Sequence, residues 1–128
     1  MNESGHTQAI NKKVKAAGVY ALKIQTMMNN GVPDCWYSGN LDDLWVEFKY
    51  ISDKVLPKKE GTLIQPTLSD LQYNWLIERG NEGRNVAVAI GSSIGWAIYP
   101  IWDRPIHKTE LNMTRNEVAE WIIKQTNA

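Results

Sequence analysis

The sequence predicts an α/β domain with one central mixed five-stranded sheet flanked by helices. Five short apolar segments with strand-like composition are bounded by turn residues, and three other segments have helical spacing or helix caps. Their order along the chain is helix, three strands, helix, two strands and helix, which is typical of a sheet covered by helices. The chain has 128 residues, about the length of one domain, so we expect a single domain over residues 1–128.

The three expected helices are marked by residues that favour helix ends. Gly18 and Gly80 each follow a helical segment, and glycine suits the position just past a helix end. The second helix follows a proline and a capping sequence, and the third begins with a capping box formed by Thr114 and Glu117. The predicted ranges are Ser4–Ala17, 67–80 and Thr114–Lys124.

The five expected strands show period-two patterning or short apolar runs between turn signals. In the first strand Tyr20, Leu22 and Ile24 alternate with less apolar residues. An Asn-Asn-Gly turn follows it, and a polar loop at 38–43 joins the next two strands as a hairpin. Residues 52–65 show no period, so we expect an irregular basic loop there. The predicted strands are Val19–Met27, Pro33–Tyr37, Leu44–Ile51, Asn85–Ile90 and Gly95–Ile101.

Composition excludes several classes of protein. The formal net charge is zero, which argues against a protein that coats nucleic acid by bulk charge. The single cysteine, Cys35, excludes an intrachain disulfide and a cysteine-based zinc site. No apolar run approaches the roughly 20 residues that span a bilayer, and the start of the sequence lacks a signal-peptide pattern. We therefore expect a cytoplasmic protein that does not associate with membranes.

Positive charge is nevertheless concentrated in two segments. Between Glu3 and Asp34 there are four lysines and no acidic residue. These lysines either form a solvated helix face or contact phosphate groups. A second basic group lies in the loop predicted at 52–65. The lysines of the two groups are Lys12, Lys13, Lys15 and Lys23, and Lys54, Lys58 and Lys59.

Three charged residues of the predicted hairpin form the candidate site. Side chains alternate between the two faces of a strand, so Glu47 and Lys49 project side by side, opposite to Val46 and Phe48. Asp34 lies across the hairpin, where opposed side chains are about 5 Å apart. Two carboxylates, with water and phosphate oxygens, are ligands that Mg²⁺ prefers. The alternative is a cross-strand ion pair in which the lysine neutralises the two acids.

The residues around this site resemble a known nuclease motif. Gly31-Val32-Pro33-Asp34 followed by Glu47-Phe48-Lys49 is similar to the PD-(D/E)XK motif. With a helix that contains Leu68-Ser69-Asp70-Leu71-Gln72, the chain resembles the VRR-NUC group, especially its small stand-alone forms from bacteriophages. The resemblance covers about Tyr20 to Ile90 and implies a restriction-endonuclease-like fold. It further implies that Asp34 and Glu47 bind the metal with the main-chain carbonyl of Phe48, and that Lys49 and Gln72 are catalytic-site residues.

The glutamine of the second helix also raises a question of its own. Gln72 shares a helix face with Leu68, Leu71, Trp75 and Leu76, which we expect to face the sheet. An amide on that face needs hydrogen-bond partners. An active-site carboxylate, the lysine or a bound phosphate would serve, and the alternative is a satisfied core amide.

The resemblance implies an enzyme that cleaves DNA with Mg²⁺ or Mn²⁺. Many relatives carry a glutamate on the first helix, where this chain offers Gln8, with Glu3 near the helix start as the candidate for a further metal ligand. The small phage forms imply a homodimeric Holliday junction resolvase, with the two lysine groups as tracks for the DNA arms. Alternatives are a flap- or nick-directed endonuclease and a catalytically inactive DNA-binding module. A restriction-type enzyme ranks below these because the chain has no extra region to read bases.

Overall fold

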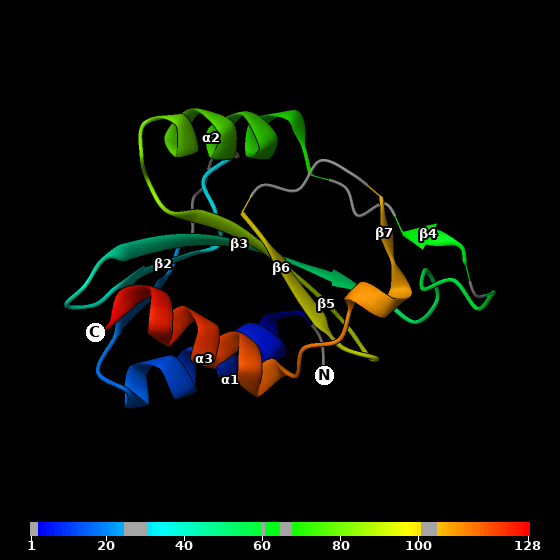
Figure 1. Cartoon of the computed structure of the whole chain (residues 1–128), viewed down its shortest axis with the longest axis horizontal. Coiled ribbons are helices and arrows are strands. Elements are labelled where there is room, and N and C mark those ends of the chain that lie inside the picture. The colour runs from blue at the N-terminus through cyan, green and yellow to red at the C-terminus, as the bar shows by residue number, and fades with distance from the viewer. Residues whose placement is uncertain (1–2, 25–30, 60, 65–67, 101–104) are drawn as a thin grey trace.

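The computed structural model describes residues 3–24, 31–59, 61–64, 68–100 and 105–128. Three α-helices and seven strands are arranged along these residues, with one short 3-10 helix, η1 (Figure 1). The elements are α1 (Glu3–Ala16), β1 (Tyr20–Lys23), β2 (Cys35–Ser38), β3 (Asp43–Ile51), β4 (Leu63–Ile64), α2 (Asp70–Asn81), β5 (Val86–Ser92), β6 (Trp96–Tyr99), β7 (Ile106–His107), η1 (Lys108–Glu110) and α3 (Arg115–Thr126).

The central sheet has five strands in the order β1-β2-β3-β5-β6, which confirms the predicted mixed five-stranded sheet. β3 and β5 are parallel, and the other three neighbouring pairs are antiparallel. A parallel pair requires a crossover connection, and the segment that contains α2 supplies it. β2 and β3 pair as the predicted hairpin, with Cys35 opposite Val46.

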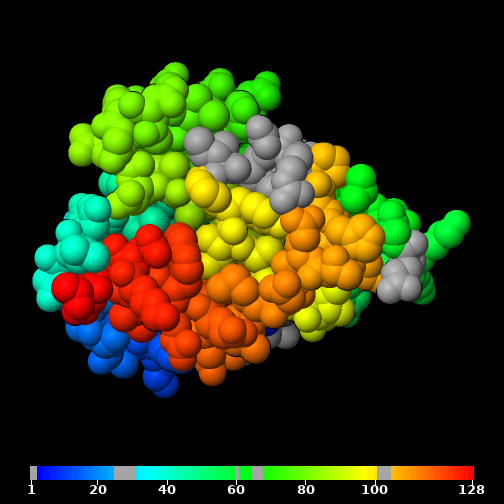
Figure 2. Space-filling model, viewed as in Figure 1, coloured from blue at the N-terminus to red at the C-terminus, as the bar shows by residue number. Residues whose placement is uncertain are grey.

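Helices cover the sheet on both faces. α1 and α3 lie together on one face, and α2 lies on the other (Figure 1). Figure 2 shows the same layers in space-filling form, with atoms of β6 visible between α2 and α3. Val46 and Phe48 are buried in the core cluster that also contains residues of α1 and α3. Since neighbouring side chains alternate, Glu47 and Lys49 of β3 face the layer of α2.

A second, two-stranded sheet was not predicted. β4 pairs antiparallel with β7, and Ile64 lies opposite Ile106, both of them buried. Part of the segment predicted as an irregular loop is therefore a strand. Two-residue strands are too short to produce a period-two pattern, so the sequence alone carries no signal for them.

Several predicted boundaries shift by a few residues. β1 ends at Lys23, and residues 25–27 of the predicted strand lie outside the described part of the chain. α2 continues through Gly80 to Asn81, so Gly80 does not end it. α3 extends two residues beyond Lys124, to Thr126. None of the helices described here is long and apolar enough to span a membrane.

Candidate active site

Asp34 is held at the point where the chain enters β2. The register places it opposite Glu47, one position before the Cys35–Val46 pair. Its Oδ2 accepts a hydrogen bond of 2.9 Å from the backbone N–H of Phe48, and its own carbonyl accepts one of 2.7 Å from Ile24. The side chain is therefore fixed against β3 by backbone groups, as the predicted hairpin requires.

Glu47 is almost completely buried beside it. The side chain is only 2% exposed, and a side-chain hydrogen bond joins it to Asp34. Burial, then this hydrogen bond and the charge of Asp34, raise the pKa of Glu47 to about 9, although the nearby charge of Lys49 lowers it. Without a cation, the two adjacent carboxyl groups therefore retain a proton at neutral pH.

Lys49 interacts with α2 and not with the two acids. Its Nζ donates a hydrogen bond of 3.1 Å to Oε1 of Gln72. Within the described ranges, the ion pairs do not include Asp34, Glu47 or Lys49. The alternative of a cross-strand ion pair is therefore not what the structure contains, and the lysine is one of the partners considered for the half-buried amide of Gln72.

Gln72 is itself held by the first turn of α2. Ser69 is the N-cap residue, and its Oγ accepts a hydrogen bond of 3.2 Å from the Gln72 N–H. Oε1 of Gln72 in turn accepts one of 3.0 Å from the Ser69 N–H, which completes a capping box. One amide oxygen thus caps the helix and orients the lysine. Ser69 belongs to the capping sequence predicted before this helix, but its connection to the lysine through Gln72 was not predicted.

The prediction of which α2 residues face the sheet is partly wrong. Leu76 is buried and Leu68 and Trp75 are partly buried, but Leu71 is 50% exposed. Leu71 and Gln72 are neighbours on the helix, about 100° apart, so both cannot lie at the centre of one face. The structure places Gln72 and Leu76, four residues apart, toward the sheet.

Glu3 lies close to the two acids, at the start of α1. It lines a pocket of about 230 Å³ with Asp34 and Lys23. Burial, followed by the charge of Asp34, raises the pKa of Glu3 above its usual range, while the charge of Lys49 opposes this. Gln8 is absent from this pocket. The first residue of α1 therefore contributes a third carboxylate to the surroundings of the site.

The donor set fits a divalent cation that keeps part of its water. Among the described residues, no three His, Cys, Asp or Glu side chains form a group that holds a metal ion alone. Asp34 and Glu47 supply two carboxylates in direct contact. The N–H of Phe48 points to Asp34, and in an antiparallel ladder the carbonyl of a residue points to the same side as its N–H. Mg²⁺ is usually held by one or two carboxylates with several waters, so these three donors suit it.

A glycine couples the segment before Asp34 to α2. Gly31 has a φ of +83°, and a Cβ there would lie 2.2 Å from the Leu71 carbonyl oxygen and 2.9 Å from the Gln72 nitrogen. Such contacts with backbone require the first turn of the helix to move. The glycine that precedes the Pro-Asp pair thus allows the segment that carries Asp34 to approach Gln72 closely.

Gly31→Ala is expected to lower the free energy of unfolding by about 2 kcal/mol or more, through backbone strain together with steric overlap. Gly18→Ala is the matched control, because Gly18 has a φ of +87° but nothing within 4 Å of its Cβ position. We expect the control to lose only the strain energy of about 1 kcal/mol. Urea denaturation of both variants measures the difference. Equal losses in the two variants would contradict the proposed contact.

The predicted lysine tracks occupy separate places. Lys12, Lys15 and Lys23 line one pocket beside α1, whereas Lys13 forms an ion pair of 3.2 Å with Glu120 of α3. The lysines of the second basic group lie between β3 and β4, and they line neither of the pockets that the first group lines. The members of the second group, which are all exposed, are Lys54, Lys58 and Lys59.

The architecture is that of the restriction-endonuclease-like nucleases, which is the fold of the PD-(D/E)XK and VRR-NUC proteins. Hjc from Archaeoglobus fulgidus, a Holliday junction resolvase from an archaeal hyperthermophile, matches with a TM-score of 0.57 and 16% identity over 91% of this chain and 98% of Hjc. A VRR_NUC domain matches with a TM-score of 0.50 and 22% identity over 70% of this chain and 84% of that domain. No protein-family model and no curated protein matches the sequence.

Proposed function

We propose that this protein is a metal-dependent endonuclease that hydrolyses phosphodiester bonds in DNA. The observation that carries the proposal is the arrangement of Asp34, Glu47 and Lys49 on one face of the sheet. Two carboxylates touch there, one of them buried, without an ion pair to the adjacent lysine. A structural ion pair would instead place the lysine on the acids. The nuclease fold of the two structural neighbours supports the same conclusion.

Asp34, Glu47 and the Phe48 carbonyl are proposed to hold Mg²⁺ or Mn²⁺. The ion would act as a Lewis acid toward the scissile phosphate and lower the pKa of attacking water. Lys49 is proposed to orient that water and to stabilise the negative charge that develops on the phosphate. Gln72 holds the Nζ of Lys49 in place through its 3.1 Å hydrogen bond, and Ser69 holds Gln72.

The proposed substrate is a four-way DNA junction, cut by a homodimer. Symmetric resolution requires two nicks and therefore two active sites, while each chain supplies one. The printed description of Hjc as a Holliday junction resolvase supports this choice of substrate. Exposed Tyr20 and Leu22 on β1, an edge strand, leave apolar surface that suits pairing with another copy.

Incubation of the purified protein with three DNA substrates tests the proposed specificity. In Mg²⁺ we expect paired, symmetric nicks in a four-way junction, at a rate at least tenfold above that for a flap or a linear duplex. The products are resolved on denaturing gels, with EDTA as the blank. Preferential cutting of the flap would favour a repair endonuclease, and equal cutting of all three would contradict the junction assignment. Binding without cutting in any metal would favour an inactive DNA-binding module.

A further inference from the structure

Three lysines from two elements line a single groove beside the candidate active site. Lys12 and Lys15 come from α1, and Lys23 comes from the end of β1. They line a pocket of about 320 Å³ together with Gln8 and Asn11. Because α1 and β1 are separate elements, this clustering follows from the fold and not only from the helical spacing of the lysines.

The groove continues into the candidate active site through one shared residue. Lys23 lines both this pocket and the 230 Å³ pocket that contains Glu3 and Asp34. Its Nζ accordingly lies near the start of α1, where it donates a hydrogen bond of 3.3 Å to the Ser4 hydroxyl. The two pockets therefore adjoin at Lys23, beside Glu3 and Asp34.

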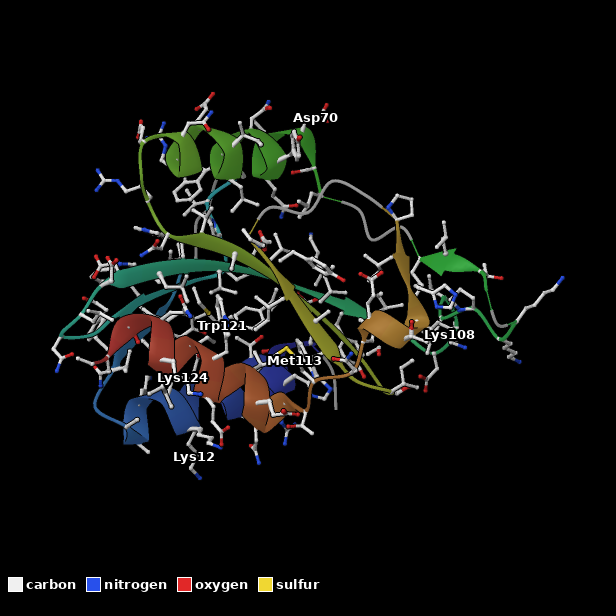
Figure 3. All side chains as sticks on the ribbon, viewed as in Figure 1. Lys12, Asp70, Lys108, Met113, Trp121 and Lys124 are labelled. Carbon is white, nitrogen blue, oxygen red and sulfur yellow. The ribbon has the colours of Figure 1, made fainter. Side chains whose placement is uncertain are left out.

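The lysines of the groove form no salt bridge within the described part of the protein. Lys12, Lys15 and Lys23 take part in none of the ion pairs there, whereas Lys13, on the same helix, binds Glu120 at 3.2 Å. Figure 3 shows Lys12 projecting from α1 away from the sheet, on the opposite side from Asp70 of α2. Lys23 also lies near the acidic Glu3, but the three lysines line one groove without a salt bridge to any described residue and suit a ligand with repeated negative charges.

We propose that this groove binds the sugar–phosphate backbone of one DNA strand, on one side of the phosphate that is cleaved. The inference rests on the proposed nuclease function and adds the path of the substrate. Gln8 and Lys15 are seven residues apart on α1, or roughly 10 Å at 1.5 Å per residue. That length corresponds to about three base-pair steps along the axis of a duplex. The groove would contact phosphates and not base edges, so we expect it to bind DNA irrespective of sequence.

Anisotropy titrations of labelled DNA in EDTA test the groove independently of cleavage. Lys12→Gln/Lys15→Gln/Lys23→Gln should reduce the slope of log K against log salt by about 2 to 3, because each phosphate contact contributes roughly 0.9. The dissociation constant at about 0.1 M salt should rise between roughly tenfold and 500-fold. Lys13→Gln is the matched control and should stay within twofold of the parent, because its partner is Glu120.

Neutral methylphosphonates locate the strand relative to the cleavage site. Replacing three consecutive phosphates on one side of the cut should weaken binding to the parent protein but not to the triple variant. The same change on the other side should weaken binding to both proteins equally. Thermal melts confirm that the variants fold. If the triple variant does not fold, the single variants Lys12→Gln and Lys15→Gln, both at exposed positions, replace it.

The outcomes separate this proposal from the nuclease assignment. An unchanged salt slope in the triple variant, or an equal loss in Lys13→Gln, would overturn the groove whether or not the parent cleaves DNA. A reduced slope in a protein that never cleaves DNA would support the groove as a DNA-binding surface and refute the nuclease function instead.

Discussion

Lys49→Ala is expected to lower the single-turnover rate of DNA cleavage by a factor of roughly 10² or more, with DNA affinity within about twofold of the parent. Lys49 lies on β3 next to the two acids, and its Nζ is held at a defined position by Gln72. A fixed charge of this kind acts on the transition state, where negative charge develops, more than on the bound substrate. The loss should therefore appear in the rate at saturating DNA and not in the dissociation constant.

The control for this variant is Lys124→Ala, which removes an exposed lysine from α3, on the opposite face of the sheet. Both variants are measured on the same four-way junction, with binding determined in EDTA. The control should cleave at the parental rate. A Lys49→Ala protein that cleaves as fast as the parent would remove Lys49 from the catalytic site.

Glu47→Gln is expected to abolish cleavage and to make the metal-free protein more stable at alkaline pH. In the folded, metal-free protein the pKa of Glu47 is about 9, whereas its ordinary value is 4.5. Between these values the folded state binds a proton that the unfolded state has released. The contribution of Glu47 to the free energy of unfolding is therefore fully present below about pH 4.5 and is lost as the pH rises toward 9, by up to about 1.4 kcal/mol per pH unit.

The glutamine variant lacks this ionisable group and should lose that part of the pH dependence. Urea denaturation in EDTA at pH 6 and pH 8.5 measures the effect, and the stability of the variant relative to the parent should be greater at pH 8.5 than at pH 6. Glu78→Gln, an exposed position on α2, is the control and should follow the parent at both values. A parent whose stability does not fall over this range would contradict the burial of a carboxyl group beside Asp34.

Glu47→Gln also tests metal binding without a measurement of cleavage. A ligand that binds only the folded protein stabilises it by mass action, by about 2.7 kcal/mol at a concentration one hundred times its dissociation constant. Mn²⁺ should therefore raise the melting temperature of the parent and of Glu78→Gln, with a larger effect at higher pH because the ion displaces the proton of Glu47. It should leave Glu47→Gln almost unchanged.

The parts of the site that depend on local pattern were predictable from the sequence. Alternation in 44–51 placed Val46 and Phe48 in the core and Glu47 on the opposite face, as observed. The two adjoining strands also placed Asp34 beside Glu47, because a one-residue shift of the register would turn the buried residues to the other face. The alternation of side chains along the strands was therefore enough to predict that Asp34 and Glu47 lie next to each other.

The remaining parts depend on contacts between distant segments, which local patterns do not encode. Nothing in the sequence indicates that Gly31 meets the backbone of Leu71. The sequence grouped Lys13 with the other lysines near α1, yet Lys13 of α1 forms an ion pair with Glu120 of α3. Which charges remain available for a ligand is decided by such tertiary pairs.

Anomalous diffraction from crystals grown with Mn²⁺ tests the central claim most directly. That claim is that Asp34, Glu47 and the carbonyl of Phe48 hold one divalent ion beside Lys49. The expected result is an anomalous peak in contact with all three donors in the parent, and no such peak in Glu47→Gln. A parent crystal with no peak between the two carboxylates, or with its only peak elsewhere, would contradict the account.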